Sequence, residues 1–240
     1  MAIDERLGQA FPFDVPAIRF FTWANHTISL GRSQNPERRL DLDSCRRDGL
    51  DVVRRPTGGK ELLHGSDLCY SVIWPVRGAG MLIEAGRLFA RINDLIVAAL
   101  GKLGIRGERR QSTDRRGGGQ GPCFMQVERG EIAVDGRKLV ASAQRIYSDA
   151  VLQQGSMPLR RPPIELSDYL ARFDREEIRK KLSESSTYFY EHADETISVG
   201  SVVDTFKGEF ERSLGLESRS FTKEVEAIIQ DMLKTQELRS

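Results

Sequence analysis

The first 75 residues alternate short apolar runs with turn-forming residues, a pattern typical of β-strands. β-Branched and aromatic side chains are concentrated at residues 18–23, 27–30, 51–53 and 68–73. Only three residues separate the first two runs, so we expect these two to form a hairpin. The pattern therefore predicts four strands near the start of the chain.

A longer apolar period begins after residue 80 and predicts a helix. Apolar side chains recur there at intervals of three and four, which places them on one helical face. Gly104 is expected to end this helix, because glycine is common just past a helix C-terminus. The apolar positions are Ala85, Leu88, Phe89, Ile92, Leu95, Ile96, Ala99, Leu100 and Leu103.

The second half of the chain returns to strands and then changes to helices. Residues 131–134, 138–144 and 150–152 are strand-like, and Asp135-Gly136 forms the turn between the first two. Strands followed by helices predict one α+β domain over residues 1–240, with a mixed, largely antiparallel sheet flanked by helices. The apolar positions of two predicted C-terminal helices are Val199, Val202, Val203, Phe206 and Phe210, and then Val225, Ile228, Ile229 and Met232.

The amino-acid composition is typical of globular proteins. Of 240 residues, 39% are hydrophobic and 30% are charged. No apolar run approaches the roughly 20 residues that span a bilayer, and the first residues are acidic rather than basic. We therefore expect a cytoplasmic protein with no membrane partner. The net charge of +1 predicts no general attraction to nucleic acid.

Charge is nevertheless uneven along the chain. Residues 101–122 carry six basic and two acidic side chains, a local net charge of +4. Two interpretations stay open: a solvated loop, or a docking surface for an acidic partner.

A glycine turn between two predicted strands is the first candidate for chemistry. Neither a helix nor a strand accommodates the run Arg54-Arg55-Pro56-Thr57-Gly58-Gly59-Lys60. Paired glycines let the backbone approach a ligand closely, and the flanking arginines supply positive charge. A purely structural turn is the alternative.

Lys138 is the second candidate. A lysine that leaves a hairpin usually lies on the surface, but polar residues crowd around the two strands that follow. Polar side chains inside a sheet are costly unless they bind something. These polar residues are Ser142, Gln144, Gln153, Gln154 and Ser156.

Cys123 is the third candidate and the most accessible of three cysteines. It follows a glycine-rich loop, whereas Cys69 lies in an apolar strand and Cys45 in a predicted helix. An odd cysteine count without CxxC spacing argues against a disulfide scaffold and a zinc knuckle. Neighbouring basic groups lower the pKa of a thiol, and Lys138 lies one hairpin away. The three histidines form no metal-ligand or Ser/His/Asp spacing, so we predict no metal site.

These candidates, in this order, resemble the lipoate–protein ligase A and octanoyltransferase superfamily. The glycine turn with His64 resembles its RRPTGG(R/K)…LH signature, and residues 136–144 resemble GRK-x-x-GSAQ. Residues 152–156 resemble LQHGS, although Gln154 stands where histidine is usual and Ala141 where glycine is usual. Residues 19–34 resemble RFY-x-W…LS-x-G-x-x-Q. The chain looks most like the cysteine-dependent octanoyltransferases of the M type, because Cys123 falls at the position of their catalytic cysteine.

The resemblance implies a fold and a reaction. It implies a biotin/lipoate ligase-like catalytic domain that moves an octanoyl group from acyl carrier protein to a lysine of a lipoyl domain, through a thioester on Cys123. The acceptor would be a glycine cleavage H protein or a 2-oxoacid dehydrogenase E2. No cofactor would be required. Two alternatives stay open: an ATP- and Mg-dependent lipoate–protein ligase that forms lipoyl adenylate, and an octanoyl amidotransferase between carrier domains.

The same resemblance implies roles for individual residues. Cys123 and Lys138 would be catalytic. The start of the chain matches a helix that family members reach only after an N-terminal strand, so two interpretations stay open: the domain lacks that strand, or the natural start of the protein lies upstream. The implied substrate-binding residues are Arg54, Arg55, Thr57, Gly58, Gly59, Lys60, His64, Ser142, Ala143, Gln144, Gln154, Gly155 and Ser156.

Overall fold

The computed structural model describes most of the chain. The described residues are 1–11, 14–76, 81–111, 121–215, 217–218, 220, 223, 226–227 and 230. The second predicted C-terminal helix rests on Val225, Ile228, Ile229 and Met232, which lie outside them. Most of the glycine-rich loop before Cys123 also lies outside them, as do Arg115 and Arg116 of the basic stretch.

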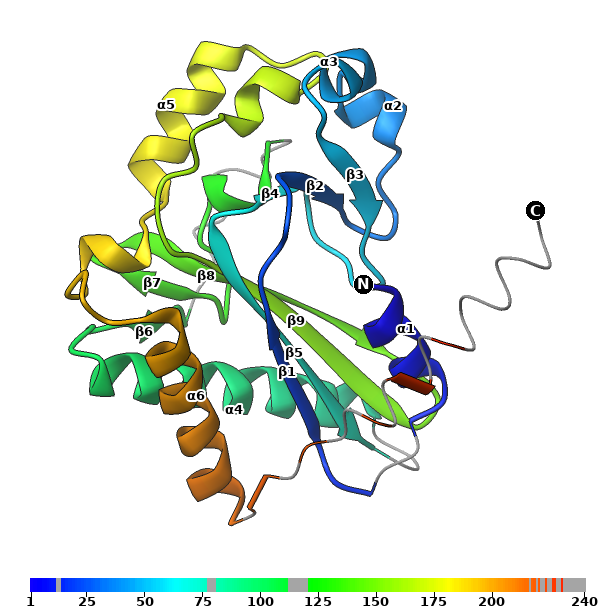
Figure 1. Ribbon diagram of the computed structural model, residues 1–240, viewed down its shortest axis with the longest axis vertical. Helices are drawn as coiled ribbons and strands as arrows, with labels where there is room; N and C mark the ends of the chain where they lie inside the picture. Colours follow the sequence, from blue (N-terminus) through cyan, green and yellow to red (C-terminus); the bar gives the residue numbers. More distant parts are fainter. Residues whose placement is uncertain are drawn as a thin grey trace.

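A six-stranded sheet forms the centre of the molecule (Figure 1). Its strand order is β1-β5-β9-β8-β7-β6, and every neighbouring pair is antiparallel. The predicted largely antiparallel sheet is therefore confirmed. The strands are β1 (Ala17–Phe21), β5 (Asp67–Pro75), β6 (Glu108–Arg109), β7 (Ile132–Val134), β8 (Arg137–Ile146) and β9 (Ala150–Pro158).

A second sheet has three strands in the order β3-β2-β4. Strand β2 (Thr27–Leu30) lies in the middle, parallel to β3 (Asp51–Arg54) and antiparallel to β4 (Leu62–His64). The predicted hairpin of residues 18–23 and 27–30 is wrong, because β1 pairs with β5 in the other sheet. All four residues of β2 are buried. Complete burial of this kind is more typical of a strand in the middle of a covered sheet than of one arm of a hairpin.

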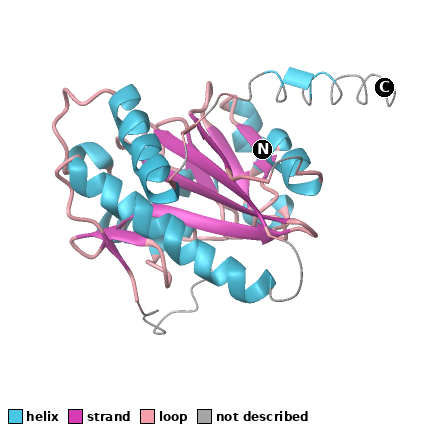
Figure 2. Ribbon diagram, turned by 90° about the horizontal axis from the view of Figure 1, so that it is seen from below, coloured by secondary structure: helices cyan, strands magenta, loops and turns pink. Residues whose placement is uncertain are grey.

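Two helices cover one face of the six-stranded sheet. The predicted helix α4 (Met81–Lys102) lies along that face, as Figure 2 shows, and α6 (Val199–Leu214) packs beside it. Their buried apolar side chains join those of β5, β8 and β9 in the largest hydrophobic cluster. Helix α1 (Ala2–Gln9) contacts β5 and β9 through Leu7, which clusters with Ile73 and Leu152.

Shorter helices surround the small sheet. They are α2 (Pro36–Arg39), α3 (Leu42–Arg47), α5 (Arg175–Ser185) and the 3₁₀ turn η2 (Leu166–Tyr169). Apolar side chains of α3, α5 and η2 form a second cluster with Ile28 and Leu30 of β2. No helix among the described residues is long and apolar enough to cross a membrane.

Local sequence signals explain several boundaries. Asp174 accepts hydrogen bonds from the amides of Glu176 and Glu177 and so begins α5, a helix that the apolar pattern did not predict. Gly215 ends α6 in the left-handed conformation with φ of 62°. Asp135 and Gly136 both have positive φ, at 50° and 76°, so the predicted tight turn between β7 and β8 is confirmed.

Candidate active site

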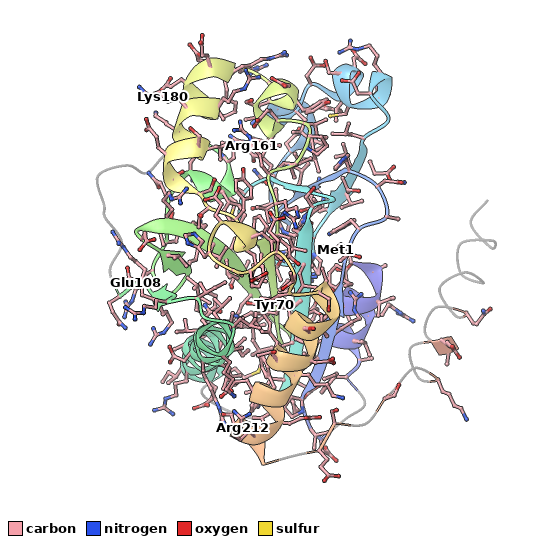
Figure 3. All side chains as sticks on the ribbon, turned by 60° about the vertical axis from the view of Figure 1, so that its left-hand side comes forward. Met1, Tyr70, Glu108, Arg161, Lys180 and Arg212 are labelled. Carbon is pink, nitrogen blue, oxygen red and sulfur yellow. The ribbon has the colours of Figure 1, made fainter. Side chains whose placement is uncertain are left out.

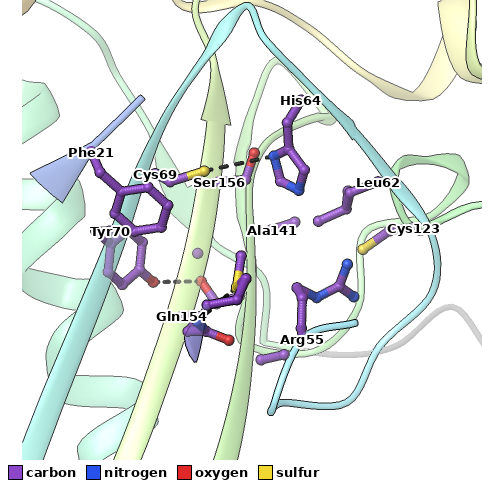
Figure 4. A pocket seen from close by; sticks show the side chains of 14 residues that line it. Phe21, Arg55, Leu62, His64, Cys69, Tyr70, Cys123, Ala141, Gln154 and Ser156 are labelled. Carbon is purple, nitrogen blue, oxygen red and sulfur yellow. Dashed lines mark hydrogen bonds between the residues drawn. The ribbon is translucent and has the colours of Figure 1, made fainter. Parts of the chain in front are cut away.

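A pocket lies between the two sheets and receives residues from both (Figure 4). Its empty volume is about 380 Å³, including the part open to solvent, and its exposed lining is mostly apolar. Figure 3 shows the labelled Met1 and Tyr70, which both line this pocket, near the middle of the molecule. The lining residues are Met1, Phe21, Arg55, Leu62, His64, Cys69, Tyr70, Cys123, Ala141, Ser142, Ala143, Gln154, Gly155 and Ser156.

Cys123 begins a 3₁₀ turn, η1 (Cys123–Met125), at the wall of the pocket. Its amide donates to the carbonyl oxygen of Glu61 at 3.3 Å, which anchors the turn beside β4. Burial raises the pKa of the Cys123 thiol, and the positive charges of Lys138, Arg55 and Lys60 oppose that rise. In Figure 4 the Cys123 sulfur and the Arg55 guanidinium point toward one another. The site therefore surrounds a largely protonated thiol with groups that stabilise its thiolate.

Lys138 is fully buried, which excludes the surface position that its place after a hairpin suggested. Its Nζ donates to the carbonyl oxygen of Cys123 at 2.6 Å and lies 2.5 Å from Oε2 of Glu131. The same ammonium lies 5.6 Å from the centre of the Phe124 ring, within the range of a cation–π contact. Strand β8 thus brings a buried cation against the turn that carries Cys123.

The two arginines of the glycine turn have different surroundings. Arg55 is buried, and its guanidinium donates to the carbonyl oxygens of Ser29, Gly58 and Lys60. It therefore holds the glycine turn in shape while it lines the pocket. Arg54 is exposed and donates to the carbonyl oxygens of residues 31, 32 and 34, so its side chain does not line the pocket.

The other turn residues act through their backbone or through neighbours. Gly59 has φ of 93°, a conformation that favours glycine, and a Cβ there would lie 3.1 Å from Arg55. The Thr57 hydroxyl donates to Oε1 of Gln154 at 2.9 Å, which ties the turn to β9. Among the predicted binding residues, Thr57, Gly58, Gly59 and Lys60 do not line the pocket.

Strands β8 and β9 supply the remaining predicted residues. Ala143 pairs with Gln154, and Ser142 pairs with Gly155. A Cβ on Gly155 would lie 2.1 Å from the Tyr70 ring, so the missing side chain makes room for that ring. The Ser142 hydroxyl lies 2.7 Å from that of Tyr70. Gln144 donates to Gln153 at 3.1 Å and lies outside the pocket.

His64 belongs to a buried hydrogen-bond chain. Its Nδ1 lies 2.6 Å from Oδ2 of Asp67, and its Nε2 lies 2.6 Å from the hydroxyl of Ser29. Arg55 donates to that same hydroxyl at 2.6 Å, so the hydroxyl proton of Ser29 faces Nε2. Because both ring nitrogens have partners and the Trp23 ring stacks on the imidazole, the His64 side chain is held in one orientation in the wall of the pocket.

His64, Asp67 and Cys69 are a group that could hold a metal ion, since their ligand atoms lie within 4.8 Å of one another. Hydrogen bonds already engage those atoms. The carboxylate of Asp67 accepts from the Cys69 thiol at 3.1 Å and from the Ser156 hydroxyl at 2.6 Å, besides its contact with His64. The distances from the Asp67 carboxylate to His64 and Cys69 are shorter than the usual separation of two ligand atoms bound to the same metal ion. The cluster therefore fits a hydrogen-bonded support for the pocket wall better than a metal site.

We expect Asp67→Asn to destabilise the fold strongly. Asparagine keeps one acceptor oxygen but puts an amide donor in place of the other, so at least one of the donors His64, Cys69 and Ser156 loses its acceptor, at a cost of about 1–3 kcal/mol. Urea unfolding measures the loss, with Asp43→Asn as the matched control on a side chain that is 90% exposed. An equal effect of the two substitutions would contradict the supporting role of Asp67.

The loss of stability in Asp67→Asn should depend on pH. Burial raises the pKa of the Asp67 carboxyl, but His64 and the donated hydrogen bonds outweigh burial and hold the pKa below its usual value. The stability that Asp67 contributes is thus present above the pKa of the unfolded chain, about 3.9. It is lost as the pH falls through the lower folded value. The wild type and Asp67→Asn should therefore become more alike in stability below about pH 4.

The sequence patterns missed several residues of this site. Phe21, Leu62 and Tyr70 line the pocket from strands where they read as ordinary core residues. Asp4 of α1 is buried and accepts from Gln154 at 2.7 Å. Glu131 pairs with Lys138. An acidic residue at a buried strand end is a signal that could have singled out Glu131, because a buried carboxylate needs a partner.

The family is defined by comparison with known proteins. The model of the lipoyl protein ligase A/B catalytic domain matches residues 1–211, and the chain belongs to this family. A protein from an Exiguobacterium species, named octanoyltransferase LipM, is 34% identical over 99% of this chain and 90% of its own length. An octanoyltransferase LipM of Lysinibacillus sphaericus is 28% identical over 92% of this chain and 84% of its own length. The resemblance inferred from the motifs is confirmed.

Solved structures share the fold. A putative lipoate protein ligase of T. acidophilum with bound lipoic acid superimposes with a TM-score of 0.77, at 22% identity, over 98% of this chain and 88% of that one. A lipoate-protein ligase A bound with ATP gives a TM-score of 0.76 at 20% identity, over 97% of this chain and 87% of that one. The predicted α+β class and the lipoate ligase-like fold are therefore confirmed.

Proposed function

We propose that this protein is an octanoyltransferase of protein lipoylation, which moves an octanoyl group from a carrier thioester to a lysine of a lipoyl domain. One observation carries the proposal. The half-buried Cys123 lies on the wall of a mostly apolar pocket, and the ammonium of Lys138 lies 2.6 Å from its carbonyl oxygen. Several relatives named octanoyltransferase LipM support the same activity.

The first step is thioester exchange. The Cys123 sulfur attacks the acyl carbonyl carbon of the octanoyl carrier, the bond from that carbon to the carrier sulfur breaks, and the thiol proton passes to the departing carrier thiolate. Both sides contain one thioester and one thiol, so the step is close to balanced in free energy. The cysteine divides one difficult transfer into two easier ones.

The second step forms an amide. The neutral amine of an acceptor lysine attacks the acyl carbonyl carbon on Cys123, the carbon–sulfur bond breaks, and an amine proton returns to the cysteine sulfur. Conversion of a thioester to an amide is downhill. We therefore propose that the reaction needs no ATP and no cofactor.

The surrounding residues receive distinct roles in this proposal. The positive charges of Lys138 and Arg55 favour the thiolate of Cys123 and the negative oxygen that develops on the acyl carbonyl. The eight-carbon chain occupies the apolar pocket beside Phe21, Leu62 and Ala141–Ala143. Gln154, Gly155 and Ser156 of β9 pair with these β8 residues and continue the same wall of the pocket.

The partners that fit this chemistry are two carrier proteins. The donor is an octanoyl-acyl carrier protein. The acceptor is a lipoyl domain, either a glycine cleavage H protein or a 2-oxoacid dehydrogenase E2. One of the solved neighbours belongs to a lipoylation system of Thermoplasma acidophilum that pairs a bipartite lipoate protein ligase with its E2 lipoyl domain. Because both proposed reactants are intracellular carriers, we place the enzyme in the cytoplasm.

Intact mass spectrometry tests the proposal directly. After incubation with octanoyl-acyl carrier protein and no nucleotide, we expect the enzyme to gain one octanoyl group, with peptide mapping on Cys123. Addition of an apo-lipoyl domain should then return the enzyme to its original mass and add the octanoyl group to the domain. An enzyme that modifies the lipoyl domain only with free lipoate and ATP would be a ligase. One acylated only by an octanoyl lipoyl domain would be an amidotransferase.

A further inference from the structure

Glu131 forms a buried ion pair at the site and has no role in the mechanism described so far. It precedes β7, its side chain is buried, and its Oε2 lies 2.5 Å from Nζ of Lys138. The same Oε2 accepts a hydrogen bond from the amide of Glu128 at 2.7 Å. A main-chain donor and the Lys138 ammonium therefore hold one carboxylate oxygen of Glu131 in place.

Among the described residues that contact the Lys138 ammonium, Glu131 supplies the negative charge. Its side chain has no solvent exposure, and its Nζ contacts are the carboxylate of Glu131, the carbonyl oxygen of Cys123 and the face of the Phe124 ring. A buried ammonium without an anion loses its proton at neutral pH more readily than it stays charged. The carbonyl oxygen and the aromatic ring are neutral. Glu131 is thus the carboxylate in direct contact with the ammonium among the described residues.

We propose that Glu131 is a positioning residue, which keeps Lys138 protonated and directs its ammonium onto the turn that carries Cys123. Glu131 itself lies away from the lining of the pocket and acts only through Lys138. The proposal rests on the octanoyltransferase function, because the charge of Lys138 assists catalysis only if Cys123 takes part in thioester exchange. It adds one residue to the groups that take part in that function: Glu131 acts on Lys138, and Lys138 acts on Cys123.

The charges around Cys123 allow a test with a defined sign. Lys138, Arg55 and Lys60 lower the pKa of the Cys123 thiol, whereas Glu131 raises it, and the influence of Lys138 exceeds that of Glu131. If Glu131→Gln makes Lys138 neutral, Cys123 loses the larger, favourable charge, and its reactivity moves to higher pH. If Lys138 keeps its charge without Glu131, only the repulsion disappears and the reactivity moves to lower pH.

The first experiment measures alkylation of Cys123 by iodoacetamide as a function of pH, with peptide mapping to separate it from Cys45 and Cys69. We expect the profile of Glu131→Gln to move to higher pH, toward that of Lys138→Ala. Glu128→Gln is the matched control, because it is the same chemical change three residues away on an exposed side chain. Its profile should match the wild type. A shift to lower pH in Glu131→Gln, or no shift, would overturn the proposal.

The second experiment is a double-mutant cycle on octanoyl transfer. We expect Glu131→Gln to lower kcat about tenfold or more with little change in KM for either carrier. The Glu131→Gln and Lys138→Ala changes combined should cost no more than Lys138→Ala alone, because Glu131 acts through Lys138. Additive losses would mean that Glu131 acts by another route and would contradict the proposal.

The two experiments separate this proposal from the proposed function. If the wild type accepts no octanoyl group, the transferase function fails, and the alkylation profiles still decide whether Glu131 governs the charge of Lys138. If the wild type transfers octanoate and Glu131→Gln does so at the same rate, only the role of Glu131 fails. Thermal unfolding of each variant shows that the compared proteins are folded.

Discussion

Cys123→Ala should abolish octanoyl transfer, with a loss of at least about 10³-fold in rate. Without the sulfur no enzyme thioester forms, and the acyl group has no covalent position beside the pocket. The side chain is small and only half-buried, so its truncation should leave the fold intact. The rate of octanoyl transfer from acyl carrier protein to a lipoyl domain measures the effect.

Cys45→Ser is the matched control for this substitution. Cys45 lies in α3 in the cluster around the small sheet, and it does not line the pocket. Serine in that apolar position should cost some stability, but the folded fraction should keep its rate of transfer. Full activity of Cys123→Ala would contradict the thioester mechanism, and activity only with free lipoate and ATP would favour the ligase.

Lys138→Ala should lower the rate of transfer by about 10²-fold or more. The substitution removes the buried cation nearest the turn of Cys123, and with it the charge that most strongly favours the thiolate. The pH profile of Cys123 alkylation should move to higher pH as a result. Steady-state kinetics should show the loss mainly in kcat, because Lys138 does not line the pocket.

Stability has to be measured beside the kinetics of Lys138→Ala. The change leaves Glu131 as a buried carboxylate without its ion-pair partner, at a cost of about 3–5 kcal/mol. The double variant with Glu131→Gln removes that unpaired charge, and it should recover stability without recovering transfer. Lys207→Ala on α6, about half exposed, is the control for a surface lysine. A fully active Lys138→Ala would show that the buried cation is dispensable.

The amino-acid sequence determined most elements of the fold. The apolar period of three and four predicted α4, because a long amphipathic helix must turn one stripe toward the core. Asp135-Gly136 predicted the turn between β7 and β8, because few residues adopt two successive positive φ angles. The ordered motifs also predicted the family, which the match over residues 1–211 confirms. These features depend on local conformational preference or on residue identity at fixed spacing, and both can be recognised from the amino-acid sequence alone.

Only the tertiary structure decided which strands pair and which polar residues meet. The nearest neighbours in sequence, β1 and β2, entered different sheets, because pairing depends on the burial of whole strands rather than on the length of one connection. Arg54 and Arg55 are adjacent, yet the former is exposed and the latter is buried in the pocket wall. Lys138 follows a hairpin turn but is enclosed by Glu131, Cys123 and Phe124. A buried charge exists only where distant parts of the chain bring it a partner, and the packing of the folded chain decides where that happens.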